Sequence, residues 1–296
     1  EAQMNEIKKS VENAAFSVDS IKKGEKIKKT PLPFTTSTLQ QEASKRLNMS
    51  TQKTMRLAQE LYEGVTLKGK GSVGLITYLR TDSTRISEEA DASCREYIAQ
   101  QYGEQFVGDK TAVKSSKTGK IQDAHEAIRP TDSSLSPAML KEQLPRDLFR
   151  LYQLIWTRFL ASRMAEAVYE TTSVKIGAGD YRFNVAASKV KFDGFMTVYS
   201  YDSEKSTMNA AMKKITKDTE ITLSGLDPQQ HFTQPPAHFT EASLVKTLEE
   251  LGIGRPSTYA PTITTLLARR YIVKESKNLY ITELGEAVND MMEDGF

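Results

Sequence analysis

Hydrophobic positions follow a helical period in the first half of the chain, a two-residue period in the middle and a helical period again near the end. The clearest helical pattern lies in residues 146–165, where it places Trp156 on a buried face. The helical period also predicts helices at residues 36–47, 51–62, 86–102, 136–144, 240–251 and 257–269. The two-residue period predicts strands at residues 13–21, 171–176, 181–188, 195–201 and 220–224. Together these patterns predict an α+β chain.

Local signals set the ends of several predicted helices. Thr38 and Gln41 fit a capping box at the start of the first helix, and Ser257 is placed to cap the last one. The buried stripe of the second helix includes Tyr62. Near the C-terminus a helix, a glycine turn, a second helix and two short strands follow one another. That order is typical of a winged helix-turn-helix.

Composition narrows the class of protein. Hydrophobic residues make up 39% and charged residues 26% of 296 residues, as in soluble globular proteins of two or three domains. No apolar run approaches the roughly 20 residues of a membrane span, and no signal peptide is recognised. The single cysteine, Cys94, excludes an intrachain disulfide and a cysteine-rich zinc ribbon within this chain. It is typical of a reducing cytoplasm.

Basic residues are clustered although the net charge is only +2. One lysine tract, interpreted as a linker before Pro31, contains Lys22, Lys23, Lys26, Lys28 and Lys29. A second lysine tract lies in a predicted loop and contains Lys110, Lys114, Lys117 and Lys120. Three arginines, Arg255, Arg269 and Arg270, lie at the ends of the last predicted helices. Such clusters indicate either nucleic-acid contacts or ordinary solvated surface, and for the lysine tracts the two interpretations carry equal weight.

Residues 74–84 contain the most informative pattern, a tyrosine two positions before an arginine. On an extended strand, Tyr78 and Arg80 would share one face. A phenol beside a fixed positive charge suits attack on a phosphodiester and stabilisation of its oxygens. The alternative is that Tyr78 is a packing residue of a strand.

The segment resembles the active-site motif of type IA DNA topoisomerases, which reads I-T-Y-M-R-T-D-S-T in the bacterial topoisomerase I branch. Here Leu79 replaces the methionine, and Leu79 and Asp82 favour this branch over the topoisomerase III branch. The resemblance implies that Tyr78 is the nucleophile, that Arg80 stabilises the phosphate, and that Thr81 and Asp82 lie against DNA.

Four other blocks resemble the same family, at residues 33–41, 122–131, 151–156 and 239–260. In the second, the resemblance implies that His125 contacts or orients a phosphate near the scissile one. Arg129 is either a clamp on the DNA backbone or one half of a buried ion pair. Directly before the last block, His238 stands where the family commonly has arginine.

Phosphate contacts are also expected at the start of the last predicted helix. Arg255 supplies charge there, and Ser257 and Thr258 offer hydroxyl groups and backbone amides. The alternative role of Ser257 is that of an ordinary N-cap, and the two roles can coexist. Tyr259 is expected to be a packing residue, although it could stack on a base.

The resemblance implies a fragment of a toroidal enzyme. Residues 1–34 and 166–236 would form a β-rich arch, residues 35–165 an inserted helical domain carrying the tyrosine, and residues 237–296 a winged-helix-like domain. The family's Toprim domain supplies acidic ligands for Mg²⁺. This chain has no D-x-D element, so we expect no metal ligands or cofactor within it. The chain is expected to start in mid-protein and to stop before the family's C-terminal DNA-binding domains.

The resemblance implies a topoisomerase that needs no ATP, and the chain has no P-loop. The complete enzyme would cleave one strand through a 5′-phosphotyrosyl intermediate, pass a strand, religate and so relax negative supercoils. Its partners would be single-stranded and negatively supercoiled DNA in the bacterial cytoplasm, associated with the nucleoid. Without Toprim, the chain is expected to bind DNA but not relax it. The alternatives are a non-catalytic winged-helix DNA-binding module and, with little support, a tyrosine recombinase.

Overall fold

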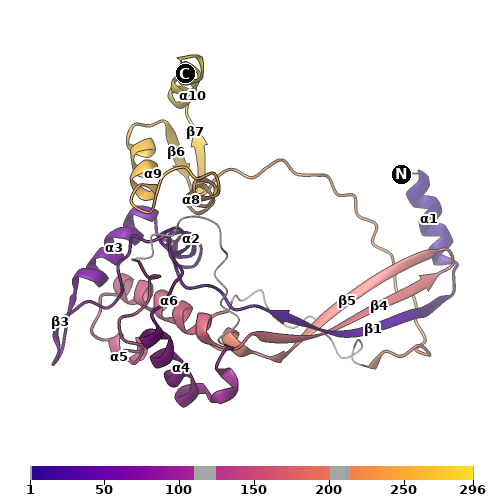
Figure 1. The fold of residues 1–296 in the computed structure, drawn as a ribbon. Helices are drawn as coiled ribbons and strands as arrows, with labels where there is room; N and C mark the ends of the chain where they lie inside the picture. Colours follow the sequence, from indigo (N-terminus) through magenta and orange to yellow (C-terminus); the bar gives the residue numbers. More distant parts are fainter. Residues whose placement is uncertain (1, 110–124, 201–211, 213, 296) are drawn as a thin grey trace. The chain divides into compact units, whose positions relative to one another are not determined.

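The computed structural model describes residues 2–109, 125–200, 212 and 214–295. These residues combine helices with antiparallel strands, which confirms the α+β class. They form two compact units, one of Glu1–Lys29 with Glu166–Pro235 and the other of Thr30–Ala165 with Pro236–Phe296 (Figure 1). The second lysine tract, at residues 110–120, lies outside the described residues.

The first unit is built on one antiparallel sheet of three long strands in the order β1-β4-β5. Its strands are β1 (Phe16–Lys28), β4 (Ala167–Ala178) and β5 (Tyr181–Phe192), with helix α1 (Ala2–Glu12) before them and the 3-10 helix η3 (Gly194–Thr197) after them. Residue pairing is regular along most of its length, with register shifts between Val18 and Ser20 and between Val168 and Tyr169.

Three predictions for this unit are wrong. The lysine tract from Lys22 to Lys28 is not a linker but the second half of β1, because pairing with β4 continues to Lys28. The strand predicted at residues 195–201 begins instead as η3, and residues 220–224 form no strand. Alternating polarity is a weak strand signal where no neighbouring strand supplies hydrogen bonds.

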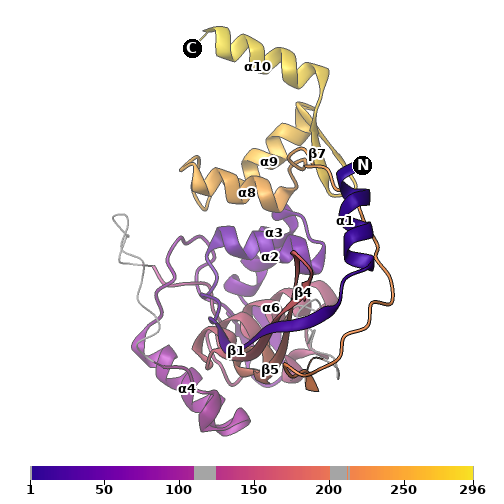
Figure 2. The same cartoon turned by 90° about the vertical axis from the view of Figure 1, so that its right-hand side faces the viewer.

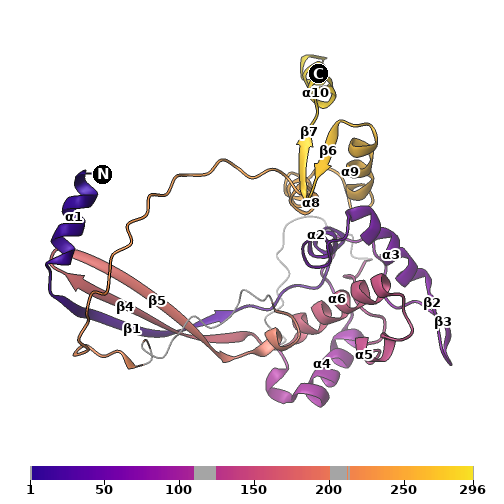
Figure 3. The ribbon, with the colours of Figure 1, turned by 180° about the vertical axis from the view of Figure 1, so that it is seen from behind.

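The second unit contains a helical group around α6 (Arg146–Arg163), which Figure 3 shows crossing it. Its other members are α2 (Thr36–Leu47), α3 (Thr51–Glu63), α4 (Glu88–Tyr102), α5 (Pro137–Leu140) and the 3-10 helix η1 (Glu104–Phe106), with a hairpin of β2 (Val65–Leu67) and β3 (Gly71–Val73). Trp156 is buried and donates its indole N–H to the Ser133 carbonyl at 3.0 Å, so its predicted place in the core is confirmed.

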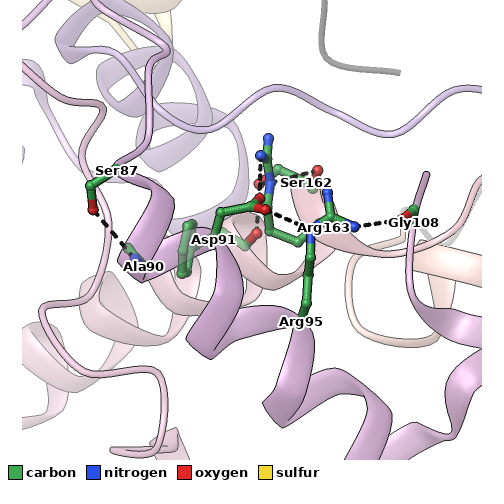
Figure 4. Close-up of polar contacts among 8 residues, drawn as sticks. Ser87, Ala90, Asp91, Arg95, Gly108, Ser162 and Arg163 are labelled. Carbon is green, nitrogen blue, oxygen red and sulfur yellow. Dashed lines mark hydrogen bonds and ion pairs between the residues drawn. The ribbon is translucent and has the colours of Figure 1, made fainter. Parts of the chain in front are cut away.

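A half-buried ion cluster joins α4 to α6 (Figure 4). The Asp91 carboxylate receives hydrogen bonds from Arg95 at 2.7 Å and from Arg163 at 2.9 Å. Burial alone would raise the pKa of Asp91, but the two guanidinium groups outweigh it and hold that pKa below its usual value. The cluster holds α4 and α6 together within the helical group that supports the candidate site.

Helix ends differ from their predicted positions. The first helix of this unit is capped by Thr35, whose hydroxyl accepts the Thr38 N–H, so Thr38 is the third helical residue and not the cap. The helix predicted at residues 136–144 is only the short α5. The cap of the last predicted helix is Thr258 rather than Ser257, because the helix begins one residue later.

A winged helix-turn-helix completes the second unit, as its element order predicts. It comprises α8 (Glu241–Glu250), α9 (Tyr259–Ala268) and the antiparallel wing strands β6 (Ile272–Glu275) and β7 (Asn278–Ile281), followed by α10 (Glu283–Gly295). Val245, Tyr259 and Ile263 form its own small core, so the packing role of Tyr259 is confirmed. Helices α8 and α9 lie against α2 and α3 (Figure 2).

Candidate active site

Tyr78 does not lie on a strand. The segment after β3 is irregular, with bends and one isolated bridge at Ile76, so the strand prediction is wrong. Alternate residues nevertheless point in opposite directions. Tyr78 and Arg80 are exposed, whereas Leu79 and Thr81 are 1% and 2% exposed. The buried alternate residues anchor the segment and leave the phenol and the guanidinium group available on its outside.

Thr36, at the start of α2, holds the backbone on either side of Arg80. Its hydroxyl donates to the Leu79 carbonyl at 2.7 Å and lies 3.0 Å from the Thr81 carbonyl oxygen. The Thr81 N–H donates back to the Thr36 hydroxyl at 2.9 Å. Thr36 is fully buried, so these bonds are shielded from water and fix the backbone that presents Arg80.

A second segment, residues 125–131, forms hydrogen bonds around Thr77 with residues 74–84, which we call the tyrosine segment. The Thr77 N–H donates to the Arg129 carbonyl at 2.9 Å, and the Arg129 N–H donates to the Thr77 hydroxyl at 3.0 Å. The same hydroxyl donates to the Ala127 carbonyl at 2.7 Å. The tyrosine motif and the histidine motif, far apart in the sequence, are therefore one hydrogen-bonded structure.

The Tyr78 ring lies near two other rings. The His125 ring centroid is 5.7 Å away and that of Tyr62, on α3, is 5.5 Å away in an edge-on arrangement. Both separations fall within the range of favourable aromatic contacts. Tyr62 is exposed, so its predicted place in the buried stripe of α3 is wrong. Nothing in the local pattern indicates its contact with Tyr78.

Arg129 forms an ion pair rather than lying free. Its Nε donates to Glu126 Oε2 at 2.8 Å, and its Nη2 lies 2.7 Å from the same oxygen. A third contact runs from Nη1 to the Pro130 carbonyl at 3.1 Å. The side chain is half-buried, and these bonds occupy much of its donor capacity. Of the two roles predicted for Arg129, the ion pair is present in the structure, and the DNA contact stays a prediction.

Arg80 faces the winged helix across a cavity of about 370 Å³. The cavity walls come from α3, from the tyrosine segment and from the start and first turns of α9, and they include Gln52, Met55, Arg80, Ser257, Thr264 and Thr265. Arg80 and Ser257, predicted separately to bind phosphate, thus line one space. Gln52, Thr264 and Thr265 were not predicted, because they become neighbours of Arg80 only through tertiary packing.

The turn before α9 is closed by its own hydrogen bonds. The Arg255 N–H donates to the Thr258 hydroxyl at 2.8 Å, and the Arg255 side chain donates to the Gly254 carbonyl at 2.8 Å. Gly254 has φ +80° and lies so close to Thr258 that an added Cβ would be 2.9 Å from that hydroxyl. The turn therefore requires glycine. It presents Arg255 at the surface, beside Ser257 in the cavity wall.

Asp82 is exposed, and its negative charge acts on Tyr259. The pKa of Tyr259 is raised, first by burial of the phenol and then by the negative charge of Glu249, with Asp82 adding to the effect and Arg255 opposing it. The raised pKa accompanies the place of Tyr259 in the small core of the winged helix.

The part of the chain that the structure describes contains no group of three or more histidine, cysteine, aspartate or glutamate residues arranged to hold a metal ion. No helix among the described residues is both long and apolar enough to cross a membrane. The residues present at the candidate site thus supply an exposed phenol, cations and hydroxyl donors, but not a set of carboxylate ligands for Mg²⁺.

Comparison with known proteins finds matches over the whole chain. A family model described as DNA topoisomerase matches residues 1–296. The solved structure of full-length topoisomerase I from Thermotoga maritima is similar with a TM-score of 0.79 and 38% sequence identity, covering 99% of this chain and 47% of that one. The chain therefore spans about half the length of that protein.

Proposed function

The chain belongs to the bacterial type IA DNA topoisomerases, and from this we propose that it supplies the nucleophile of an enzyme that cleaves and rejoins one DNA strand. The observation that carries the proposal is the presentation of Tyr78 beside Arg80 on a segment whose alternate residues are buried. The division into an arch (1–34 and 166–236), a tyrosine domain (35–165) and a winged-helix-like domain (237–296) is part of the same proposal.

In the proposed reaction the Tyr78 oxygen attacks the phosphorus of a single-stranded DNA segment. A bond forms between that oxygen and phosphorus, and the bond from phosphorus to the 3′ oxygen of the preceding nucleotide breaks. The phenol loses its proton and the released 3′ oxygen gains one. The product is a 5′-phosphotyrosyl ester, and attack by the 3′-hydroxyl reverses the step. Because the ester conserves the energy of the phosphodiester, no ATP is required.

Arg80 stabilises the charge that develops on the phosphate oxygens. Its backbone is fixed on both sides by Thr36, so the guanidinium group needs little reorganisation as charge develops. Loss of one such donor commonly lowers a rate by about 10²–10³. His125, next to the Tyr78 ring, would contact or orient a neighbouring phosphate.

The winged helix is proposed to bind the strand beside the cleavage point. Arg255 is exposed at the turn before α9, and Ser257 lines the cavity that Arg80 also lines. A strand that passes between them would place phosphates near Arg80 and α9 together. Thr258, whose hydroxyl is engaged in the turn, would contribute its backbone rather than its side chain. Thr81 and Asp82 would lie along the same strand.

Family membership implies Mg²⁺, held by a Toprim domain with acidic residues. The residues described here do not fit a magnesium site, so no step above is assigned to a metal. We propose that the chain alone binds DNA without relaxing it, and that full activity in the bacterial cytoplasm requires Toprim. Its DNA partners would be single-stranded and negatively supercoiled.

The alternative is a non-catalytic DNA-binding module, which the winged helix favours. One assay separates the two functions. The chain is incubated with single-stranded oligonucleotide and Mg²⁺, with and without a supplied Toprim domain, and denatured protein is examined for attached label. A 5′-phosphotyrosyl intermediate retains a label placed at the 3′ end of the oligonucleotide and loses one at the 5′ end. Absence of an adduct under both conditions would favour the module.

A further inference from the structure

The two faces of the β1-β4-β5 sheet differ in charge. Residues directly opposite one another on neighbouring strands point to the same face, so the register assigns each side chain to a face. Even-numbered residues 20–28 of β1 share a face with odd-numbered residues 167–175 of β4 and even-numbered residues 184–190 of β5. We name this the lysine face. It carries Lys22, Lys26, Lys28 and Lys175, and none of its residues is acidic.

The opposite face is close to neutral. It carries Lys23, Lys189 and Lys191 together with Glu25 and Glu170. Lys191 forms an ion pair with Glu25, and Glu170 lies directly opposite Lys189. This face also holds most of the buried apolar side chains of the sheet, among them Val174, although Ala167 is buried on the lysine face. Asp19, at the bulge of β1, places its carboxylate over Gly177 on the lysine-face side, where it pairs with Arg182. The other carboxylates of the paired residues, Glu25 and Glu170, lie on the opposite face.

Three of the four lysines of the lysine face are available to a ligand, whereas Lys28 lies over the Phe195 ring. Lys22, Lys26 and Lys175 are exposed, and among the residues that the structure describes they form no ion pair. Hydroxyl and amide side chains surround them on the same face, including Ser173 and Asn184. Diagonal neighbours on adjacent antiparallel strands, such as Lys22 and Lys175, lie about 7–8 Å apart. Lys22 and Lys26 are separated by about 13 Å along β1.

We propose that the lysine face is a docking surface for the phosphate backbone of duplex DNA. Unpaired lysines accompanied by hydroxyl and amide donors are the groups that contact phosphates without reading sequence. Binding of single-stranded DNA relies on aromatic platforms for the bases. The aromatic residue on this face, Tyr169, is only half-exposed and directs its hydroxyl to the Met196 sulfur at 3.0 Å. The surface therefore suits a duplex, whose bases are already stacked.

The inference rests on the proposed function only in taking DNA as the partner, and its test does not require cleavage. Duplex binding by the full chain carrying Tyr78→Phe is measured over a range of salt concentrations. The test variant is Lys22→Gln/Lys26→Gln/Lys175→Gln. The matched control, Lys23→Gln/Lys189→Gln/Lys191→Gln, removes the same charge from the other face of the same sheet.

The lysine-face variant is expected to lower the slope of log affinity against log salt by about 3, since each phosphate contact contributes roughly 0.9. When the salt concentration rises fourfold, the affinity of the unsubstituted chain for duplex DNA should therefore fall about 40 times further than that of the lysine-face variant. The control should change the slope by less than about 1, and binding to a single-stranded oligonucleotide should be equal in both variants. Equal slopes in the two triple variants, or an effect confined to single-stranded DNA, would overturn the proposal.

Thermal unfolding of both variants checks that the sheet is intact, since exposed lysines contribute little to stability. The adduct assay distinguishes failure here from failure of the proposed function. If the adduct forms but the two triple variants have the same salt slope for duplex binding, the docking surface alone is rejected. A face-dependent slope without an adduct leaves the docking surface standing and rejects the catalytic assignment.

Discussion

The Glu241 carboxylate accepts two hydrogen bonds from Thr51, one from the backbone N–H at 2.7 Å and one from the hydroxyl at 2.9 Å. Its other oxygen accepts from Lys274 at 2.6 Å. One buried carboxylate thus joins the start of α3 to the start of α8 and to the wing strand β6. This contact connects α3, which supplies one wall of the Arg80 cavity, with the winged helix, whose α9 supplies the other wall.

We expect Glu241→Ala to destabilise the chain. Leaving buried donors without their acceptor typically costs about 1–3 kcal/mol. Here the Thr51 donors lose their acceptor, whereas solvent can replace the lost partner of the exposed Lys274. The matched control is Glu250→Ala on the same helix, whose ion pair with Lys246 is exposed and worth at most about 1 kcal/mol. Denaturant unfolding measures both. Equal losses of unfolding free energy in the two variants would show that the contacts of Glu241 do not stabilise the chain.

The same carboxylate predicts an acid-sensitive stability. Burial alone raises the pKa of Glu241, but hydrogen bonds from Lys274 and Thr51 outweigh it and leave that pKa below its usual value. Because the folded-state pKa is depressed, the stabilisation is complete above the unfolded-state pKa and is lost as pH falls through the folded-state pKa. Glu241→Gln should therefore flatten the acid limb of a plot of unfolding free energy against pH. An unchanged acid limb would contradict the assignment.

Cys94 should be inert in the folded chain. Burial raises the pKa of its thiol to about 12, so almost no thiolate exists at neutral or mildly alkaline pH. We expect iodoacetamide at pH 8 to leave the native protein unlabelled and to alkylate it once it is denatured, as intact mass shows. Complete labelling of the native chain within minutes would mean that α4 opens far more easily than its ion cluster allows.

The role of Arg129 can be decided by a double-mutant cycle. If it acts through its ion pair, Arg129→Ala and Glu126→Ala should each reduce stability, and the double variant should lose little more. The coupling expected for residues in contact is about 0.5–3 kcal/mol, measured as free energy of unfolding. A drop in the salt slope of single-stranded DNA binding for Arg129→Ala, but not for Glu126→Ala, would instead identify a phosphate clamp.

Long helices with a repeated apolar stripe could be predicted from sequence, and α6 is the clearest case. Ends of helices could not, because the run Thr35–Thr38 offers four hydroxyl side chains and only the backbone conformation decides which one caps. The lysines of β1 look like a linker because no local signal reports that β4 pairs with them. Local patterns describe one segment at a time, whereas strand pairing depends on another.

In the candidate site, too, relations within one motif could be predicted and contacts between distant segments could not. Tyr78 and Arg80 lie within one short motif, so their relation could be predicted even though the strand was wrong. Contacts across the fold carried no such signal. Tyr62 meets Tyr78 only because α3 packs beside the segment, and Ser257 meets the Arg80 cavity only because α9 packs on α3.

The most direct test of the account is whether Tyr78 alone becomes attached to DNA. Tyr78→Phe removes the hydroxyl and keeps the ring, while Tyr62→Phe does the same to the neighbouring, equally exposed phenol. With Toprim supplied, single-stranded oligonucleotide and Mg²⁺, we expect the adduct to disappear in Tyr78→Phe and to persist in Tyr62→Phe, with DNA binding unchanged in both. An adduct that survives Tyr78→Phe would contradict the assignment of the nucleophile.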